Sequence, residues 1–183
     1  MTDERQVLFA GFGGQGVLAM GKFLTHAAMS LGKNVSWLPS YGAEMRGGTA
    51  NCLVTIAENE ISSPLTENPG MAIIMNGPSL DRFEEKVKPN GTLVLNTSLV
   101  ERNPLRDDLK VLKMPVNEIA EEMGNPRGAN MLLLGAYLEK TGVVKVDEVL
   151  ELFDVIFHGK KEKVIDNNRE AFLAGVEYAR NNW

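Results

Sequence analysis

A glycine-rich turn near the N-terminus constrains the fold of this chain more than any other feature. Gly11, Gly13 and Gly16 have the G-x-G-x-x-G spacing, between a strand-like run at 6–10 and a helix-like run that begins at Val17. A turn in that position can cradle a phosphate group against the N-terminus of the helix. A tight packing turn would use the same glycines, so the motif alone predicts the strand–turn–helix unit more firmly than its ligand.

A dinucleotide-binding domain needs a second feature, which this chain lacks. Such a domain has Asp or Glu at the end of the next strand, where the carboxylate binds the ribose hydroxyls. Here the next strand-like run, 34–38, leads into a second glycine-rich segment at 39–48. The missing carboxylate argues against a stand-alone enzyme for NAD, NADP or FAD, which is kept as an alternative hypothesis.

The second glycine-rich segment carries Ser40, Tyr41, Glu44 and Arg46. A segment that only turned the chain would not need this mixture of polar side chains. Arg46 has a planar fork of donors that suits phosphate or carboxylate. The plainer interpretation is an ion pair between Glu44 and Arg46 at the surface, or with a partner chain.

The order of apolar runs predicts an α/β fold. Strand-like runs alternate with helical patterns along the first part of the chain, and from residue 116 onward the pattern is mainly helical. We predict one Rossmann-like, three-layer domain over 1–183, with a mainly parallel sheet and a helical C-terminal part. If the first two strands are adjacent and parallel, their carboxyl ends lie about 5 Å apart, so both glycine-rich loops emerge at one edge. The predicted strands are 6–10, 34–38, 50–56, 71–75, 92–96 and 110–114, with a short helix at 79–87.

The composition excludes several classes of function. The 183 residues include 19 basic and 24 acidic ones, for a net charge of −5, which argues against a nucleic-acid partner. No apolar run approaches the roughly 20 residues that a membrane span needs. With no secretory signal in the first residues and with Cys52 as the only cysteine, we expect a cytoplasmic protein without an internal disulfide.

The same inventory leaves the chain without catalytic or metal-binding residues that we can assign. One cysteine cannot supply the four thiolates of an iron–sulfur cluster, and Cys52 lies in a strand pattern, as a small buried hydrophobe would. His26 and His158 lack the spacing of a zinc site. We therefore expect the chain to be inactive alone.

A third segment, at 124–131, combines a helix start with a cation. Asn125 and Pro126 suit the N-cap and the first helical position. Arg127 opposes the helix dipole there, so we predict that it serves an anion or a partner, as Asn130 can one turn later. The run 131–138 is apolar on all sides, which predicts either a core helix or a subunit interface.

Three runs of the sequence, 11–17, 40–52 and 125–131, together resemble the gamma subunit of the 2-oxoacid:ferredoxin (acceptor) oxidoreductases. The second run is similar above all to the 2-oxoglutarate and branched-chain 2-oxoacid versions, with Ala43 where the family often has Pro. Pyruvate and indolepyruvate versions stay open as alternatives.

The resemblance implies a multisubunit enzyme that oxidatively decarboxylates a 2-oxoacid to its acyl-coenzyme A and reduces ferredoxin or a similar acceptor. Thiamine diphosphate, magnesium and iron–sulfur clusters then lie on companion alpha and beta subunits, with a delta subunit in some complexes, and coenzyme A is the co-substrate. This chain would brace the active site or act as an adaptor, and in isolation it could self-associate. The candidate cofactor-binding residues are Gly11, Gly13, Gly14, Gln15, Gly16, Ser40, Tyr41, Glu44, Arg46, Arg127 and Asn130.

Overall fold

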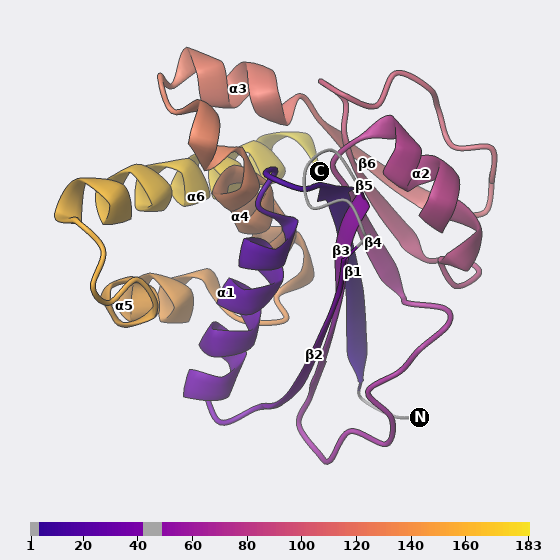
Figure 1. The fold of residues 1–183 in the computed structure, drawn as a ribbon, viewed down its shortest axis with the longest axis horizontal. Helices are drawn as coiled ribbons and strands as arrows, with labels where there is room; N and C mark the ends of the chain where they lie inside the picture. Colours follow the sequence, from indigo (N-terminus) through magenta and orange to yellow (C-terminus); the bar gives the residue numbers. More distant parts are fainter. Residues whose placement is uncertain (1–3, 42–48) are drawn as a thin grey trace. The chain divides into compact units, whose positions relative to one another are not determined.

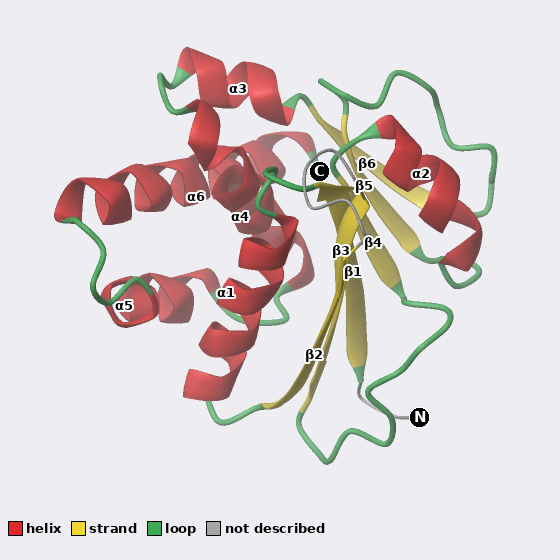
Figure 2. Ribbon diagram, viewed as in Figure 1, coloured by secondary structure: helices red, strands yellow, loops and turns green. Residues whose placement is uncertain are grey.

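The computed structural model describes residues 4–41 and 49–183, with Tyr41 described by its backbone alone. Glu44 and Arg46 lie outside the described residues. The chain divides into two compact units, Met1–Pro115 and Val116–Trp183, which are described separately below. The first unit holds the described strands, and the second holds helices (Figure 2). A single domain over 1–183 stays a prediction.

The described part of the first unit contains a six-stranded mixed sheet in the order β2-β3-β1-β4-β5-β6 (Figure 1). Three strand pairs are parallel, β1 with β4, β4 with β5 and β5 with β6, which confirms the α/β class. β3 pairs antiparallel with β1 and with β2. The strands are β1 Arg5–Phe12, β2 Asn34–Tyr41, β3 Thr49–Ala57, β4 Met71–Ile74, β5 Thr92–Asn96 and β6 Lys110–Met114.

The first two strands are not adjacent, because β3 lies between them. The segment from β2 to β3 is too short for a crossover helix, so these strands pair as an antiparallel hairpin. Since β1 and β2 are both antiparallel to β3, they still run in one direction and end at one edge. There, Thr49 of β3 pairs with Phe12 of β1, and Ala50 pairs with Tyr41 of β2. The two strand ends are thus about 10 Å apart rather than about 5 Å.

Two helices cover opposite faces of this sheet, which gives the predicted three layers (Figure 1). α1, Val17–Ser30, follows β1, and Gly32 closes it in the left-handed conformation (φ 77°) that lacks a steric penalty only for glycine. α2, Gly77–Phe83, continues into the 3₁₀ helix η1, Glu84–Lys86. The sequence predicted this helix from residue 79, whereas Asn76 caps it earlier by accepting a hydrogen bond from Ser79 N at 2.9 Å.

The second unit is helical, as predicted. Its closest packing lies between α4 and α6, where Gly135 and Gly175 let the two backbones meet. A Cβ atom on Gly135 would lie 2.0 Å from Phe172 O, and one on Gly175 would lie 1.8 Å from Leu132 O. The run 131–138 is buried within α4, so it is a core helix. The elements are α3 Val116–Glu122, η2 Pro126–Gly128, α4 Ala129–Thr141, α5 Val146–Ile156 and α6 Glu162–Asn182.

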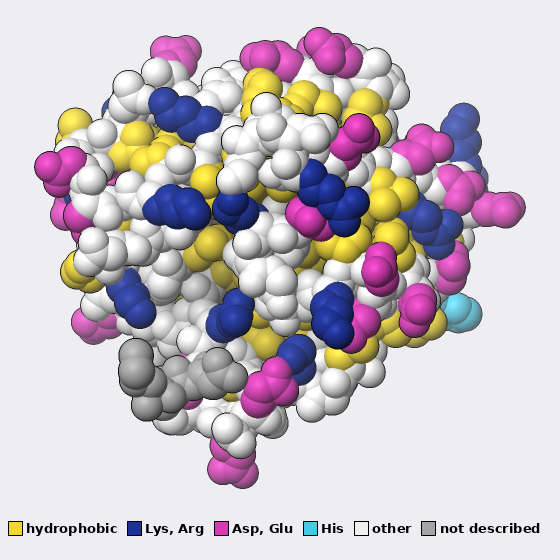
Figure 3. All heavy atoms as spheres, turned by 180° about the vertical axis from the view of Figure 1, so that it is seen from behind, with side chains coloured by type: hydrophobic (Ala, Val, Ile, Leu, Met, Phe, Trp, Pro, Cys, Tyr) yellow, Lys and Arg dark blue, Asp and Glu magenta, His cyan; other side chains and the backbone are white. Residues whose placement is uncertain are grey.

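The surface carries charges of both signs. Basic and acidic side chains both appear across the face drawn in Figure 3. None of the helices in the described residues is both long and apolar enough to cross a membrane.

Candidate functional site

The first unit has a topological switch point where β1 and β4 lie side by side. The chain leaves β1 toward α1 on one face of the sheet and leaves β4 toward α2 on the opposite face. In open α/β sheets, the carboxyl ends of two such strands border the crevice in which ligands bind. The glycine-rich turn and the Asn76 cap of α2 therefore lie where a ligand site is expected.

Gln15 fixes the glycine-rich turn to the end of β4. Its Oε1 accepts hydrogen bonds from Phe12 N at 2.6 Å and from Asn76 Nδ2 at 2.9 Å, while its Nε2 donates to Met75 O at 3.2 Å. The amide thus binds a neighbouring segment of the same chain, and contact of Gln15 with a cofactor stays a prediction. Gln15 therefore shapes the site through the loop.

Asn96, at the end of β5, extends the same network. Its Nδ2 donates to Met75 O at 3.3 Å, and its Oδ1 accepts from Ser98 N at 3.3 Å. Asn76 and Asn96 are buried. Buried amide groups with satisfied hydrogen bonds make a rigid frame, because an unmatched group there would be costly. The carboxyl ends of β1, β4 and β5 are thus held together by three side-chain amides, of which sequence reasoning found only Gln15.

The glycines of the turn have different roles. A Cβ atom on Gly11 would lie 2.6 Å from Gln15 Oε1 and 2.9 Å from Met75 Cβ. Only glycine at position 11 leaves room for the Gln15 side chain beside Met75. Gly14 and Gly16 have φ values of 102° and 77°, which other residues adopt at a steric cost. Gly13 is exposed at the turn. The predicted packing role is confirmed for Gly11, and contact of the turn with a ligand stays a prediction.

The N-terminus of α1 is a candidate position for an anion. Gly16 caps the helix without a side-chain hydrogen bond, and the first turn holds no acidic residue. The partial positive charge of a helix N-terminus favours an anion by about 0.3–1 kcal/mol at exposed sites. This end of α1 lies directly after the Gln15-anchored turn, so its amide groups have a fixed direction.

The second candidate loop is only partly described. Ser40 and Tyr41, predicted in the loop, belong to β2, where Ser40 pairs with Asn51 and is exposed. β2 continues past Pro39 because Pro39 is tolerated in an edge strand. Glu44 and Arg46 fall outside the described residues. Their role at the edge stays a prediction.

Arg82 of α2 is a site residue that sequence reasoning missed. Its Nη1 donates to Thr49 Oγ1 at 2.7 Å, and its guanidinium carbon lies 5.2 Å from the centre of the Phe83 ring. Since Thr49 pairs with Phe12, Arg82 reaches the edge where the first glycine-rich loop begins. No motif marks this position, and a cation in the last turn of a helix is ordinary, so the sequence carried no signal for it.

A crevice of about 320 Å³ opens beside the switch point. Asn76 and Phe12 form one part of its lining, and Arg102 and Asp81 form another. The Arg102 guanidinium is engaged by carboxylates, at 2.7 Å from Asp81 and 2.9 Å from Glu84. Its charge is therefore neutralised, and Arg82 is better placed to hold an anion.

Cys52 is a packing residue, as predicted. It is fully buried, its Sγ donates to Val17 O at 3.5 Å, and a Cβ atom on Gly21 would lie 2.4 Å from it. Burial raises the pKa of the thiol to about 12. Such a thiol is a poor nucleophile. Within the described residues, no cluster of His, Cys, Asp and Glu could hold a metal ion.

Arg127 and Asn130 belong to the second unit. Arg127 is exposed in η2, and Asn130 is half-buried in the first turn of α4. The sequence predicted Asn125 as an N-cap, but its side chain accepts no capping hydrogen bond. Its Nδ2 donates instead to Asn167 O at 2.8 Å. The role of Arg127 and Asn130 toward an anion or a partner stays a prediction.

Residues 6–178 match the family described as pyruvate ferredoxin/flavodoxin oxidoreductase. The chain belongs to this family. The match spans both units, and it confirms the resemblance seen in the three sequence runs.

Two curated relatives represent different members of the family. The ketoisovalerate oxidoreductase subunit VorA of Methanothermobacter marburgensis is 39% identical over 181 residues, which are 98% of this chain but 37% of VorA. The chain thus spans little more than a third of that relative. The 2-oxoglutarate synthase subunit KorC of the same organism is 34% identical over 182 residues, covering 95% of this chain and 96% of KorC.

Two solved structures share the fold. The gamma subunit of a keto/oxoacid ferredoxin oxidoreductase from Geobacter sulfurreducens has a TM-score of 0.81 at 26% identity, over 97% of this chain and 99% of its own. The 2-oxoglutarate:ferredoxin oxidoreductase of Magnetococcus marinus, solved with 2-oxoglutarate, coenzyme A and succinyl-CoA bound, has a TM-score of 0.89 at 24% identity. It covers 99% of this chain and 32% of that longer chain.

Proposed function

We propose that this chain is the gamma-type subunit of a multisubunit 2-oxoacid:ferredoxin oxidoreductase. The observation that carries the proposal is the carboxyl edge of the sheet in the first unit, where the Gln15-anchored glycine turn leads into α1 and where Arg82 reaches Thr49. Family membership also supports the proposal, because the 2-oxoglutarate synthase subunit KorC matches this chain along nearly the whole length of both. A cytoplasmic location fits a ferredoxin-linked enzyme and is part of the proposal.

The complex oxidatively decarboxylates a 2-oxoacid to its acyl-coenzyme A and passes the electrons to ferredoxin. The relatives VorA and KorC favour ketoisovalerate or 2-oxoglutarate as the substrate, and pyruvate and indolepyruvate are the further alternatives. Companion alpha and beta subunits, with or without a delta subunit, carry thiamine diphosphate, magnesium and iron–sulfur clusters. We assign no step of the electron transfer to this chain.

The contribution of this chain is to bind part of coenzyme A at the edge of the sheet. A phosphate group fits the open N-terminus of α1, where a helix of 14 residues presents its first amide groups without a side-chain cap. Arg82 supplies a guanidinium that no described carboxylate neutralises, and Arg46 is the second candidate cation. Arginine suits this task because its fork can donate two parallel hydrogen bonds to phosphate oxygens.

The experiment is to co-express this chain with candidate alpha and beta subunits from the same organism and to purify the complex. Coenzyme A-dependent reduction of ferredoxin is then measured with ketoisovalerate, 2-oxoglutarate, pyruvate and indolepyruvate. We expect activity with one of the first two acids. A chain that assembles with no such subunit, yet binds NAD, NADP or FAD with micromolar affinity in a calorimeter, would instead be a stand-alone nucleotide-binding protein.

Arg46→Ala separates an active-site role from an adaptor role. We expect lower turnover or weaker assembly while the circular dichroism of this chain stays unchanged. Normal assembly with wild-type kinetics for coenzyme A would favour an adaptor whose loops serve only the interface.

A further inference from the structure

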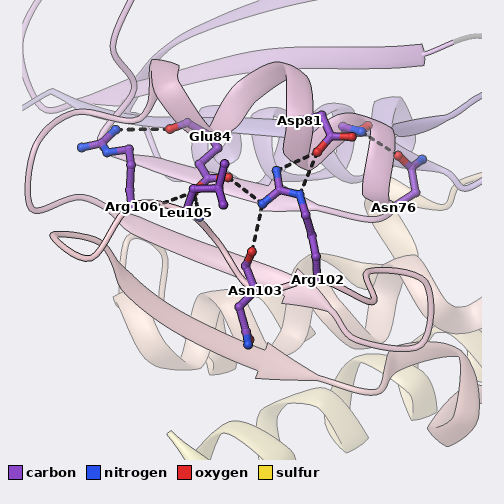
Figure 4. Close-up of polar contacts among 8 residues, drawn as sticks. Asn76, Asp81, Glu84, Arg102, Asn103, Leu105 and Arg106 are labelled. Carbon is purple, nitrogen blue, oxygen red and sulfur yellow. Dashed lines mark hydrogen bonds and ion pairs between the residues drawn. The ribbon is translucent and has the colours of Figure 1, made fainter.

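The loop between β5 and β6 is held by a buried carboxylate that the proposed function does not use. Glu84 is only 2% exposed, at the start of η1. Its Oε1 accepts hydrogen bonds from Leu105 N and from Arg106 N, the second at 2.9 Å, and its Oε2 accepts from Arg102 Nη1 at 2.9 Å (Figure 4). One carboxylate thus fixes three points of the loop.

Two arginines complete the clamp around Glu84. Arg102 also donates to Asp81 Oδ1 at 2.8 Å and to Asn103 O at 2.9 Å (Figure 4). Arg106 donates to Glu84 O at 3.2 Å and to Val87 O at 2.5 Å, so the loop is bonded to the backbone of η1 as well. Burying a carboxylate is costly unless its charge is matched and its oxygens accept hydrogen bonds, and both conditions are met here.

The clamp presents an apolar side chain to solvent. Leu105 is 83% exposed, although its backbone N–H group is bonded to the buried Glu84. Single exposed leucines are common on protein surfaces, so exposure alone indicates nothing. Leu105 differs because its backbone is fixed in advance. A loop that is already fixed before association loses less conformational entropy on binding.

The charges around Leu105 indicate the chemistry of its partner. Within the loop at 97–109, three carboxylates (Glu101, Asp107 and Asp108) stand against two guanidinium groups. Glu101 and Asp107 are both exposed. A partner surface with Lys or Arg around an apolar socket would complement this arrangement. The guanidinium groups are those of Arg102 and Arg106.

The relatives indicate which polypeptide supplies such a surface. VorA and the Magnetococcus enzyme each extend far beyond the part that matches this chain. A domain of this family is therefore accompanied by further polypeptide within one protein, and a lasting interface with that polypeptide is expected.

We propose that Leu105, held by the Glu84 clamp, is an anchor that inserts into an apolar, basic-rimmed socket on a companion subunit of the complex. The inference rests on the proposed function, because it requires that this chain work in a complex. Glu84 is a positioning residue that acts through Leu105, and Leu105 makes the contact.

The test compares variants of this chain in binding to the purified companion subunits. We expect Leu105→Asp to weaken association at least tenfold while the melting temperature of the isolated chain stays unchanged. Leu65→Asp is the matched control, because Leu65 is 75% exposed in a turn where its N–H group is bonded only to the exposed Ser63 Oγ at 3.2 Å. We expect Leu65→Asp to bind as the wild type does.

A double-mutant cycle tests the clamp. Glu84→Gln is expected to weaken association and to speed amide hydrogen exchange at Leu105 and Arg106, but to add no further loss of affinity to Leu105→Ala. Additive losses would mean that Glu84 does not act through Leu105 and would overturn that part of the inference.

The other outcomes separate the two proposals. A wild-type chain that binds no companion would end the proposed function. Wild-type assembly with unchanged binding by Leu105→Asp, or equal losses for Leu65→Asp and Leu105→Asp, would overturn the anchor alone. A homodimer of the isolated chain that Leu105→Asp dissociates would assign Leu105 to a second copy, and would also overturn it.

Discussion

The side-chain amide of Asn76 donates to the Oε1 atom of Gln15 at 2.9 Å, which joins the cap of α2 to the turn before α1. These two residues lie 61 positions apart in sequence and on opposite sides of the switch point. The same Asn76 side chain accepts a hydrogen bond from Ser79 N at 2.9 Å, so it serves a helix cap and the candidate site at once.

Asn76→Asp should therefore destabilise the chain although it keeps the cap. The carboxylate can still accept from Ser79 N, but it replaces the donor to Gln15 with a buried, charged acceptor. An unsatisfied buried group of this kind costs about 1–3 kcal/mol, and we expect that loss in the free energy of unfolding by urea. Asn103→Asp is the control, because its exposed side chain only accepts from Lys113 Nζ, and we expect a change within about 0.5 kcal/mol. Equal stability of the two variants would contradict the role given to Asn76.

Gly135→Ala should destabilise the second unit more than a glycine substitution elsewhere in it. The new Cβ atom would lie 2.0 Å from Phe172 O, which is backbone and can move only with α6. We expect a loss of about 3 kcal/mol in the free energy of unfolding, at the upper end of ordinary overpacking. Gly142→Ala is the control, because φ is 58° there and no atom lies within 4 Å of the added Cβ, so only backbone strain of about 1 kcal/mol applies. A smaller loss for Gly135→Ala than for Gly142→Ala would argue against the close helix contact.

The sequence predicted the elements that local patterns define. The boundaries of β5 and β6 agree with the runs 92–96 and 110–114. A short apolar strand between two turns has few possible start and end residues. The antiparallel β2–β3 hairpin was missed, although the short connection between those strands was a signal against a parallel neighbour.

The parts of the site that sequence did not predict depend on contacts between distant residues. Gln15 was found within the motif, but its bonds to Asn76 and Met75 follow from the pairing of β4 with β1. Arg82 reaches Thr49 across 33 positions, and nothing in its own helix indicates that contact. Local sequence therefore predicts the loop, whereas the sheet order determines which side chains surround it.

The ion pair of Arg106 and Asp108 should make stability depend on pH in a narrow acidic range. The hydrogen bond from Arg106 lowers the pKa of Asp108 from 3.8 to about 2. The unfolded chain therefore binds the proton more readily than the folded chain, and the pair contributes stability above pH 3.8 that is lost as pH falls toward 2. We expect the difference in urea midpoint between wild type and Asp108→Asn to be present at pH 5 and to shrink as the pH is lowered through that range. A difference that grew on acidification would contradict this sign.

Arg82→Met should raise the KM for coenzyme A in the assembled complex while kcat changes little. Arg82 donates through Nη1 to Thr49 Oγ1, at the edge where a phosphate is proposed. Losing a charge-assisted contact at an exposed site should raise KM about tenfold, which corresponds to about 1.4 kcal/mol. Arg82→Lys keeps the charge without the fork, so its KM for coenzyme A should lie between those of the wild type and Arg82→Met. If the difference in KM disappears with dephospho-coenzyme A, the group bound is the 3′-phosphate. Arg180→Met, which removes an exposed arginine paired with Glu139, should leave KM unchanged, whereas an unchanged KM for Arg82→Met would remove Arg82 from the site.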